Sequence, residues 1–134
     1  MERMPLDIPP AIYERVVCSV AAATKYNIPA NVMLAVAFQE AGKPGQAVLN
    51  NNGTYDYGSM QINTVWLTEL RKYNISKLAV NSPGCYPYDL AAWRIRRHIV
   101  YDKNGDFWQK VANYHSYTIE YNLIYRHAII QRSI

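Results

Sequence analysis

Two carboxylates, Glu40 and Asp56, flank a segment that is rich in turn-forming residues. Glu40 ends an apolar run that begins at Leu34, and this run is typical of the last turns of a buried helix. An apolar environment and the negative end of the helix dipole both disfavour an ionised carboxylate, so we expect a raised pKa for Glu40. A carboxyl group that holds its proton near neutral pH can act as a general acid toward a leaving oxygen. Together with a second carboxylate across a cleft, this arrangement is the one used to cleave glycosidic bonds.

The segment from Lys43 to Gly58 must place Asp56 relative to Glu40. An aspartate in such a polar segment either caps a turn and gives electrostatic support, or acts as a nucleophile. The pattern predicts a small β-hairpin or a structured loop. Its turn formers are Pro44, Gly45, three consecutive asparagines and Gly53, and its candidate strands are Val48-Leu49 and Thr54-Tyr55.

Helices are predicted to position both ends of this segment. The first helix follows Pro9-Pro10 and ends near Asn27. The second begins after Pro29 and stops at Gly42, and because it is apolar almost all round, we expect it to be buried. The apolar residues that recur at helical spacing in the first helix, and place Cys18 within it, are Ile12, Val16, Val17, Val20 and Ala23.

The second half of the chain is also predicted to be helical. Asn63 or Thr64 can cap a helix bearing Trp66 and Leu70, and helices are expected over 75–80, 87–101, 107–114 and 119–130. The inward residues expected in the last helix are Leu123, Ile124, Ala128 and Ile129. The fold class is therefore α+β and predominantly helical, in a single domain over residues 1–134.

Composition narrows the possible partners. The formal charge of +4 is mild; it suits a polyanionic surface such as the cell wall and does not indicate nucleic-acid binding. No apolar run is long enough to cross a membrane, and the start, MERMPLDIPP, lacks the apolar region of an export leader. We expect a monomer.

The two cysteines, Cys18 and Cys85, lie too far apart in the sequence for a CxxC motif. They form either one disulfide or two buried thiols. His98 and His127 fall on separate predicted helices without paired ligands, so no metal site is predicted.

The run from Asn52 to Trp66, NGTYDYGSMQINTVW, resembles a segment of animal lysozymes. It resembles still more closely the GLMQIN box of the lysozyme-like, SLT-type (family 1) lytic transglycosylases. Glu40 matches the catalytic glutamate of that family, and Asn113 to Ser116 matches its third, AYNAG-type motif. The likeness covers about residues 16 to 118 and is closest to the small transglycosylases of secretion, conjugation and pilus systems.

The resemblance implies a lysozyme-like fold with a small hairpin beside the catalytic helix, and a mechanism that needs no cofactor. Glu40 would protonate the bond between N-acetylmuramic acid and N-acetylglucosamine, and then deprotonate the muramyl 6-hydroxyl to give a 1,6-anhydro product. The substrate's acetamido group would manage the charge. Tyr114 would line the cleft and contact Glu40. The other residues implied in substrate binding are Tyr57, Gly58, Ser59, Met60, Gln61 and Asn63.

The family likeness also implies where the protein acts and what it binds. Its members open peptidoglycan for an apparatus, are usually exported to the periplasm or beyond, and often carry cysteines where Cys18 and Cys85 stand. This implies a disulfide, glycan strands as the substrate, and components of an apparatus as partners.

Three positions depart from the family pattern, namely Ala41 for serine, Ser59 for leucine and His115 for asparagine. His115 is either a hydrogen-bonding rim residue or a base. Two alternatives to a transglycosylase stay open. One is a hydrolytic lysozyme that uses Glu40 with Asp56. The other is a weakly active glycan-binding or apparatus-docking module, which Ala41 and the basic group Arg94, Arg96 and Arg97 favour.

Overall fold

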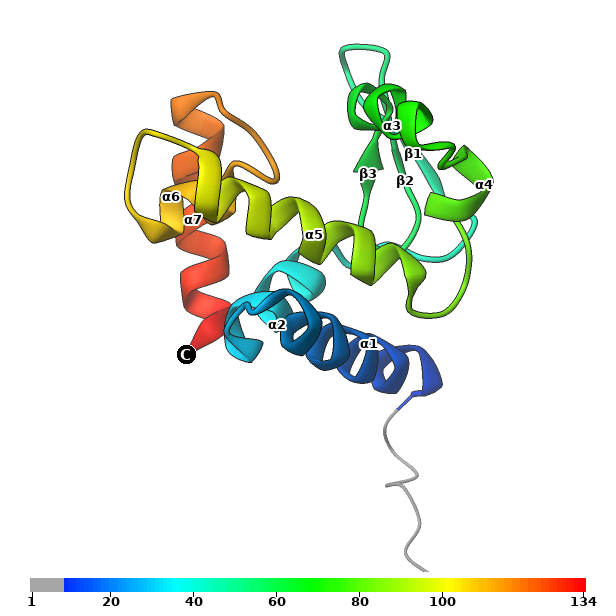
Figure 1. Cartoon of the computed structure of the whole chain (residues 1–134), viewed down its shortest axis with the longest axis horizontal. Coiled ribbons are helices and arrows are strands. Elements are labelled where there is room, and N and C mark those ends of the chain that lie inside the picture. Colours follow the sequence, from blue (N-terminus) through cyan, green and yellow to red (C-terminus); the bar gives the residue numbers. More distant parts are fainter. Residues whose placement is uncertain (1–8) are drawn as a thin grey trace, which may run out of the picture.

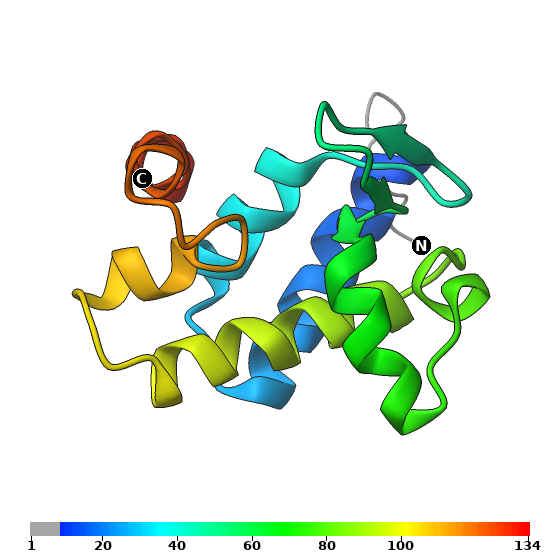
Figure 2. The same cartoon turned by 90° about the horizontal axis from the view of Figure 1, so that it is seen from above.

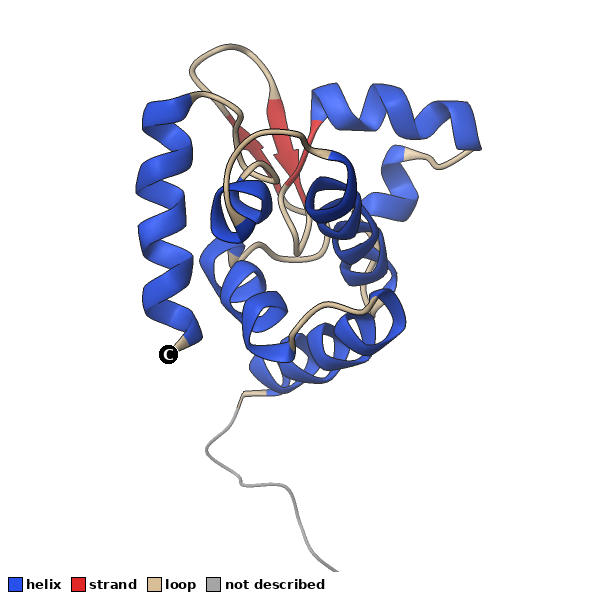
Figure 3. Cartoon of the chain, turned by 60° about the vertical axis from the view of Figure 1, so that its left-hand side comes forward, coloured by secondary structure: helices blue, strands red, loops and turns tan. Residues whose placement is uncertain are grey.

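The computed structural model describes residues 9–134, and most of this part of the chain is helical (Figure 1). The strands form one small antiparallel sheet at one end (Figure 3), as expected for a predominantly helical α+β fold. In chain order the elements are α1 (Pro10–Tyr26), α2 (Ala30–Glu40), β1 (Ala47–Leu49), β2 (Tyr55–Tyr57), β3 (Ile62–Asn63), α3 (Thr64–Leu70), η1 (Arg71–Tyr73), α4 (Lys77–Val80), α5 (Tyr86–Tyr101), α6 (Phe107–Ala112) and α7 (Ile119–Ser133).

The first two helices end as the sequence predicts. Asn27 takes a left-handed conformation, and its N–H bonds to the carbonyl of Ala23, which terminates α1. Pro29 precedes α2, whose apolar residues are mostly buried, and Ala41 ends α2 in the same left-handed way with φ of 49°. Glu40 is therefore the last helical residue of a core helix.

The apolar residues at helical spacing in α1 do not form its buried face, apart from Ala23. Ile12, Val16, Val17 and Val20 are exposed, whereas the buried residues of α1 are Cys18, Ser19, Ala22 and Ala23. Apolar residues occupy most of this helix, so their spacing alone could not select the buried side. The side that packs on α2 and α5 is the one with small residues, because they allow a close approach between helices.

The inward face of α7 is partly wrong for a similar reason. Ile129 is fully buried, but Leu123 and Ile124 are exposed. Asn122 and Tyr125 are buried instead, since this helix covers polar groups of α2 and of the segment after α6.

The sheet contains a third strand that the sequence did not predict. β1 pairs with β2, and β2 pairs with β3, both antiparallel, with Asp56 opposite Val48 on one side and Asn63 on the other. Asn63 then caps α3 by accepting a hydrogen bond from the N–H of Val65. The segment from Gly58 to Asn63, which we call the box, thus runs directly from the sheet into a helix.

Helix α5 crosses the molecule and joins its two ends. In Figures 1 and 2 it runs from α6 and α7 on one side to the sheet, α3 and α4 on the other. Cys18 and Cys85 form a disulfide that ties α1 to the start of α5. Within residues 9–134, none of the helices combines the length and apolar character required to traverse a membrane.

Candidate active site

Glu40 has the raised pKa that its position predicts. Burial raises the pKa of the Glu40 carboxyl to about 7, the hydrogen bond from Tyr125 opposes that shift, and the negative charge of Asp56 adds to it. The cations Arg94 and Arg15 oppose it as well. At neutral pH roughly half of the Glu40 side chains therefore carry a proton, as a general acid requires.

Tyr125 holds one oxygen of Glu40. Its hydroxyl donates a hydrogen bond to Oε2, and its ring stacks on that of His115 with centroids 4.6 Å apart and planes 5° apart. Sequence reasoning missed Tyr125. The available signal was its helical spacing with Ile129, because a tyrosine on a buried face needs a partner for its hydroxyl.

Arg15 fastens the end of α2 to the box, and sequence reasoning missed it too. Its Nη1 donates to the carbonyls of Ala37 at 2.9 Å and Ser59 at 3.1 Å, and its Nη2 donates to the carbonyl of Gly42. A cation at a helix C-terminus also complements the helix dipole. The guanidinium thus fixes the position of the helix end that carries Glu40.

Backbone contact at Gly42 brings the box close to α2. The Gly42 N–H donates to the carbonyl of Ser59 at 3.2 Å, and a Cβ on Gly42 would lie 2.0 Å from the carbonyl oxygen of Gly58. Gly58 has φ of +71°, and a Cβ there would lie 2.9 Å from the carbonyl oxygen of Val80. Only glycine fits at these two positions.

The box residues are mostly covered by the protein. Tyr57, Ser59 and Met60 are buried, and Met60 belongs to the core with no exposed surface. Gln61 has φ of 53°, and its side-chain amide donates to the carbonyl of Gly58 at 3.0 Å. None of Tyr57, Gly58, Ser59, Met60 and Gln61 lines the two cavities described below.

Asp56 and Asn63 are joined across the sheet. The amide Nδ2 of Asn63 donates to Oδ1 of Asp56 at 2.9 Å and to the hydroxyl of Thr54 at 3.1 Å. The Asn63 side chain therefore orients Asp56 while its own oxygen caps α3.

Tyr114 braces the box from the far end of the chain. Its buried hydroxyl donates to the carbonyl of Met60 at 2.7 Å, and burial raises its pKa well above the ordinary value. The hydrogen bond to Glu40 comes from Tyr125 instead.

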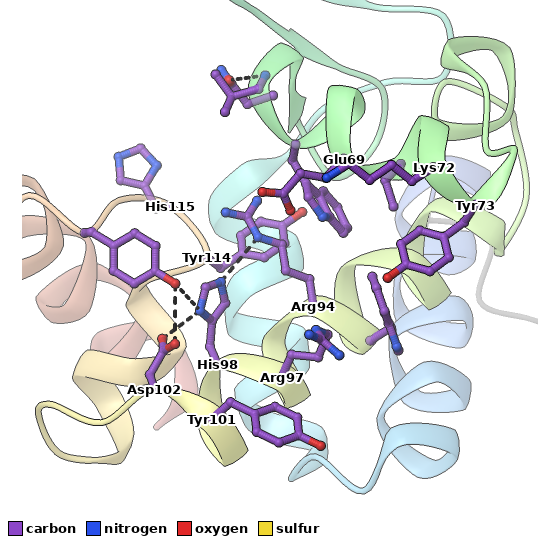
Figure 4. A pocket seen from close by; sticks show the side chains of 16 residues that line it. Glu69, Lys72, Tyr73, Arg94, Arg97, His98, Tyr101, Asp102, Tyr114 and His115 are labelled. Carbon is purple, nitrogen blue, oxygen red and sulfur yellow. Dashed lines mark hydrogen bonds and ion pairs between the residues drawn. The ribbon is translucent and has the colours of Figure 1, made fainter.

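His115 lines two separate cavities. One of about 510 Å³ lies between α3 and α5, and includes Asn63, Trp66, Arg94 and Tyr114 in its walls (Figure 4). Another of about 220 Å³ contains Glu40 with Gln39, Tyr121, Ile124, Tyr125 and Ala128. His115 lines both, so the cavity that contains Glu40 and the larger cavity share this one residue as a wall. In the described part of the chain, no cluster of three or more His, Cys, Asp or Glu is placed to hold a metal ion.

No protein-family model matches the chain. It is 34% identical over 102 residues to Protein IpgF of Shigella flexneri, and the match covers 75% of this chain and 66% of that protein. It is also 35% identical over 69 residues to Invasion protein IagB of Salmonella typhimurium (strain SL1344), covering 51% of this chain and 43% of that protein. The chain thus spans just under two thirds of IpgF and less than half of IagB. On this similarity the chain is a relative of IpgF and of the invasion protein IagB.

Proposed function

We propose that this protein is a lytic transglycosylase that cleaves the β-1,4 bond between N-acetylmuramic acid and N-acetylglucosamine in peptidoglycan. The observation that carries the proposal is Glu40 itself. Its carboxyl ends a core helix, has a pKa raised to about 7 by burial, and lines a cavity of about 220 Å³ that shares His115 with the larger one. The GSMQIN likeness of residues 58–63 supports the same reaction.

The two carboxyl oxygens of Glu40 differ in their contacts. One is held by a hydrogen bond, and the other is left to exchange a proton with the substrate. Tyr125 donates to Oε2, and in residues 9–134 no hydrogen bond engages Oε1. The proton on Oε1 passes to the glycosidic oxygen as its bond to the muramyl C1 breaks, and the substrate's acetamido group balances the charge at C1. The carboxylate of Glu40 then takes the proton of the muramyl 6-hydroxyl, whose oxygen bonds to C1 and closes the 1,6-anhydro ring. Glu40 ends the cycle protonated.

Asp56 fits an electrostatic role better than that of a nucleophile. Its negative charge raises the pKa of Glu40, while its carboxylate accepts a hydrogen bond from Asn63 and lies outside the walls of both cavities. This arrangement favours a transglycosylase, which needs one carboxyl group, over a hydrolase that would use Glu40 with Asp56.

Product analysis tests the proposal. Purified sacculi digested with the protein should yield fragments with 1,6-anhydromuramic ends by mass spectrometry. Reducing muramic ends would support the hydrolase, and the absence of soluble fragments would support a glycan-binding module. The variant Glu40→Gln should lose about 10²- to 10⁴-fold in rate, the usual contribution of a general acid.

The thermal stability of the Glu40→Gln variant shows whether it still folds, and the direction of the change in stability can be predicted. A folded-state pKa of about 7 against an ordinary value of 4.5 means that ionisation of Glu40 destabilises the fold as pH rises between these values. Glu40→Gln removes that effect, so it should unfold at a higher temperature than the parent at pH 8. A variant that clears sacculi as well as the parent would refute the role of Glu40.

We propose further that the cleavage opens the cell wall outside the cytoplasm for a secretion apparatus. The name of the relative IagB, an invasion protein, supports this setting. The disulfide between Cys18 and Cys85 suits an oxidising compartment. Thiol titration of the unreduced, unfolded protein purified from the periplasm should find no free thiol, and two free thiols would contradict the disulfide.

A further inference from the structure

The larger cavity holds a guanidinium that no acidic side chain neutralises. Arg94 projects from α5 into this cavity, with its Cζ 4.8 Å from the ring centroid of Trp66 and 5.2 Å from that of Tyr114 (Figure 4). Neither ion pair found within residues 9–134 involves Arg94. Its charge is therefore stabilised by aromatic faces but remains available to an anion.

A partly buried network of hydrogen bonds fixes the orientation of this guanidinium. Nε of Arg94 donates to Nε2 of His98 at 3.3 Å, and Nδ1 of His98 lies 2.7 Å from Oδ2 of Asp102. Asn113 donates to the same oxygen of Asp102 at 2.8 Å. Burial lowers the pKa of His98, which favours the neutral ring whose Nε2 accepts from Arg94. No hydrogen bond in the described part of the chain engages the two terminal amino groups of Arg94, so a ligand meets an already ordered fork of donors.

The rest of the cavity fits a sugar chain. Trp93 and Tyr73 line it and offer apolar surface for sugar C–H groups. Two acidic side chains, Glu69 and Asp102, also line it, but Asp102 is already bonded to His98 and Asn113. His115 lines both this cavity and the one that contains Glu40, and the charge of Arg94 lowers the pKa of Glu40.

We infer that Arg94 binds a carboxylate carried by the glycan strand, so that the protein selects acidic glycans over neutral ones. This inference rests on the proposed function. Peptidoglycan offers two sources of such a group. The lactyl group of muramic acid ends in a carboxylate when it is bare, and otherwise it carries a peptide stem with carboxylates of its own. A guanidinium pairs with either through two parallel hydrogen bonds.

Binding measurements on a protein that cannot turn over test the inference. In the Glu40→Gln background, isothermal titration calorimetry would compare three ligands: neutral chitopentaose, a peptide-free fragment of alternating N-acetylglucosamine and N-acetylmuramic acid, and the same fragment with its peptide stems. Adding Arg94→Gln should weaken binding of the carboxylate-bearing ligands about tenfold and leave chitopentaose unchanged. The matched control is Arg96→Gln, which removes the same charge from α5. The side chain of Arg96 bonds to the carbonyl of Asn27 instead and is not among the residues that line the cavity.

A chemical change in the ligand gives a second test of the same contact. Fragments whose carboxylates are converted to methyl amides should bind the Arg94-containing protein about tenfold more weakly, and Arg94→Gln should cause no further loss with them. A loss with the peptide-free fragment assigns the lactyl carboxylate. A loss confined to the stem-bearing fragment assigns the stem.

Three results would overturn the inference. The first is an equal loss of affinity for chitopentaose in Arg94→Gln, which would mean that the side chain acts through packing. The second is an equal loss of affinity in Arg96→Gln, which would mean that the net charge of α5 matters and not the position of Arg94. The third is no loss of affinity in Arg94→Gln. Each leaves the proposed function standing as long as the Glu40→Gln protein binds the fragments. If it binds none of the three ligands, the proposed function fails together with the inference.

Discussion

Around Glu40 the chain is held mainly through backbone groups, whereas the wall of the larger cavity is held through side chains. At the end of α2, Gly42 lies against Gly58, and Arg15 bonds only to carbonyls. In the larger cavity, Arg94 is held by two aromatic rings and a histidine. The difference shows how one small fold meets two demands. Proton transfer requires a carboxyl in a fixed, water-poor position, while ligand selection requires exposed groups that a partner can reach.

The disulfide connects these two regions, and breaking it should have the largest effect on stability. It joins α1, which carries Arg15, to the start of α5, which carries Arg94, and closes a loop with a sequence separation of 67. Cys18→Ala with Cys85→Ala should lower the free energy of unfolding by about 4 kcal/mol, mainly because the unfolded chain gains freedom. Chemical denaturation measures this, and the reduced parent should match the double variant. A double variant as stable as the oxidised parent would contradict the assignment.

Gly42→Ala should disrupt the Glu40 region and spare the larger cavity. A Cβ at this position would lie 2.0 Å from the backbone oxygen of Gly58, so α2 and the box must separate. We expect a loss of about 1–3 kcal/mol in stability, together with reduced clearing of sacculi. The control is Gly53→Asn, since Gly53 has open space around it and asparagine tolerates its φ of +85°. Equal stability in both variants would show that the close contact is unimportant.

Arg15→Met should combine a moderate loss of stability with a shift in the pH profile. The variant leaves the carbonyls of Ala37, Gly42 and Ser59 without this donor, at a cost of about 1–3 kcal/mol. It also removes a cation that lowers the pKa of Glu40, so that pKa should rise. Because the acid must be protonated, the alkaline fall of kcat/KM should move to higher pH. Arg15→Lys keeps the charge, so its profile should stay near that of the parent.

Tyr125→Phe should have the smallest effect on stability, and it should shift the pH profile in the same direction as Arg15→Met. The hydrogen bond from Tyr125 lowers the pKa of Glu40, so its loss should raise that pKa and extend activity to higher pH. The phenyl ring can still stack on His115, which limits the loss of stability. Tyr121→Phe, at an exposed position of the same helix and in the wall of the same cavity, is the control. An unchanged profile in Tyr125→Phe would show that this hydrogen bond does not tune the acid.

Local patterns predicted much of the helical framework correctly. The positions of Glu40 at the end of α2 and of Asn63 as a cap follow from residues within one or two turns of them. The sequence could not tell which face of α1 or α7 is buried, because both helices carry more apolar residues than they bury. The third strand escaped detection because Ile62–Asn63 is too short to show an alternating pattern.

The sequence by itself determined that the chain is mostly helical and that Glu40 closes a buried helix beside a turn-rich segment. Only the tertiary structure decided which groups surround that acid. Tyr125 lies 85 positions from Glu40, and Arg15 lies 44 from Ser59. Arg94 stands in a basic group that could equally have faced solvent. Helix and turn signals depend on neighbours within a few residues, but these contacts depend on how whole helices pack, and residue spacing does not encode that packing.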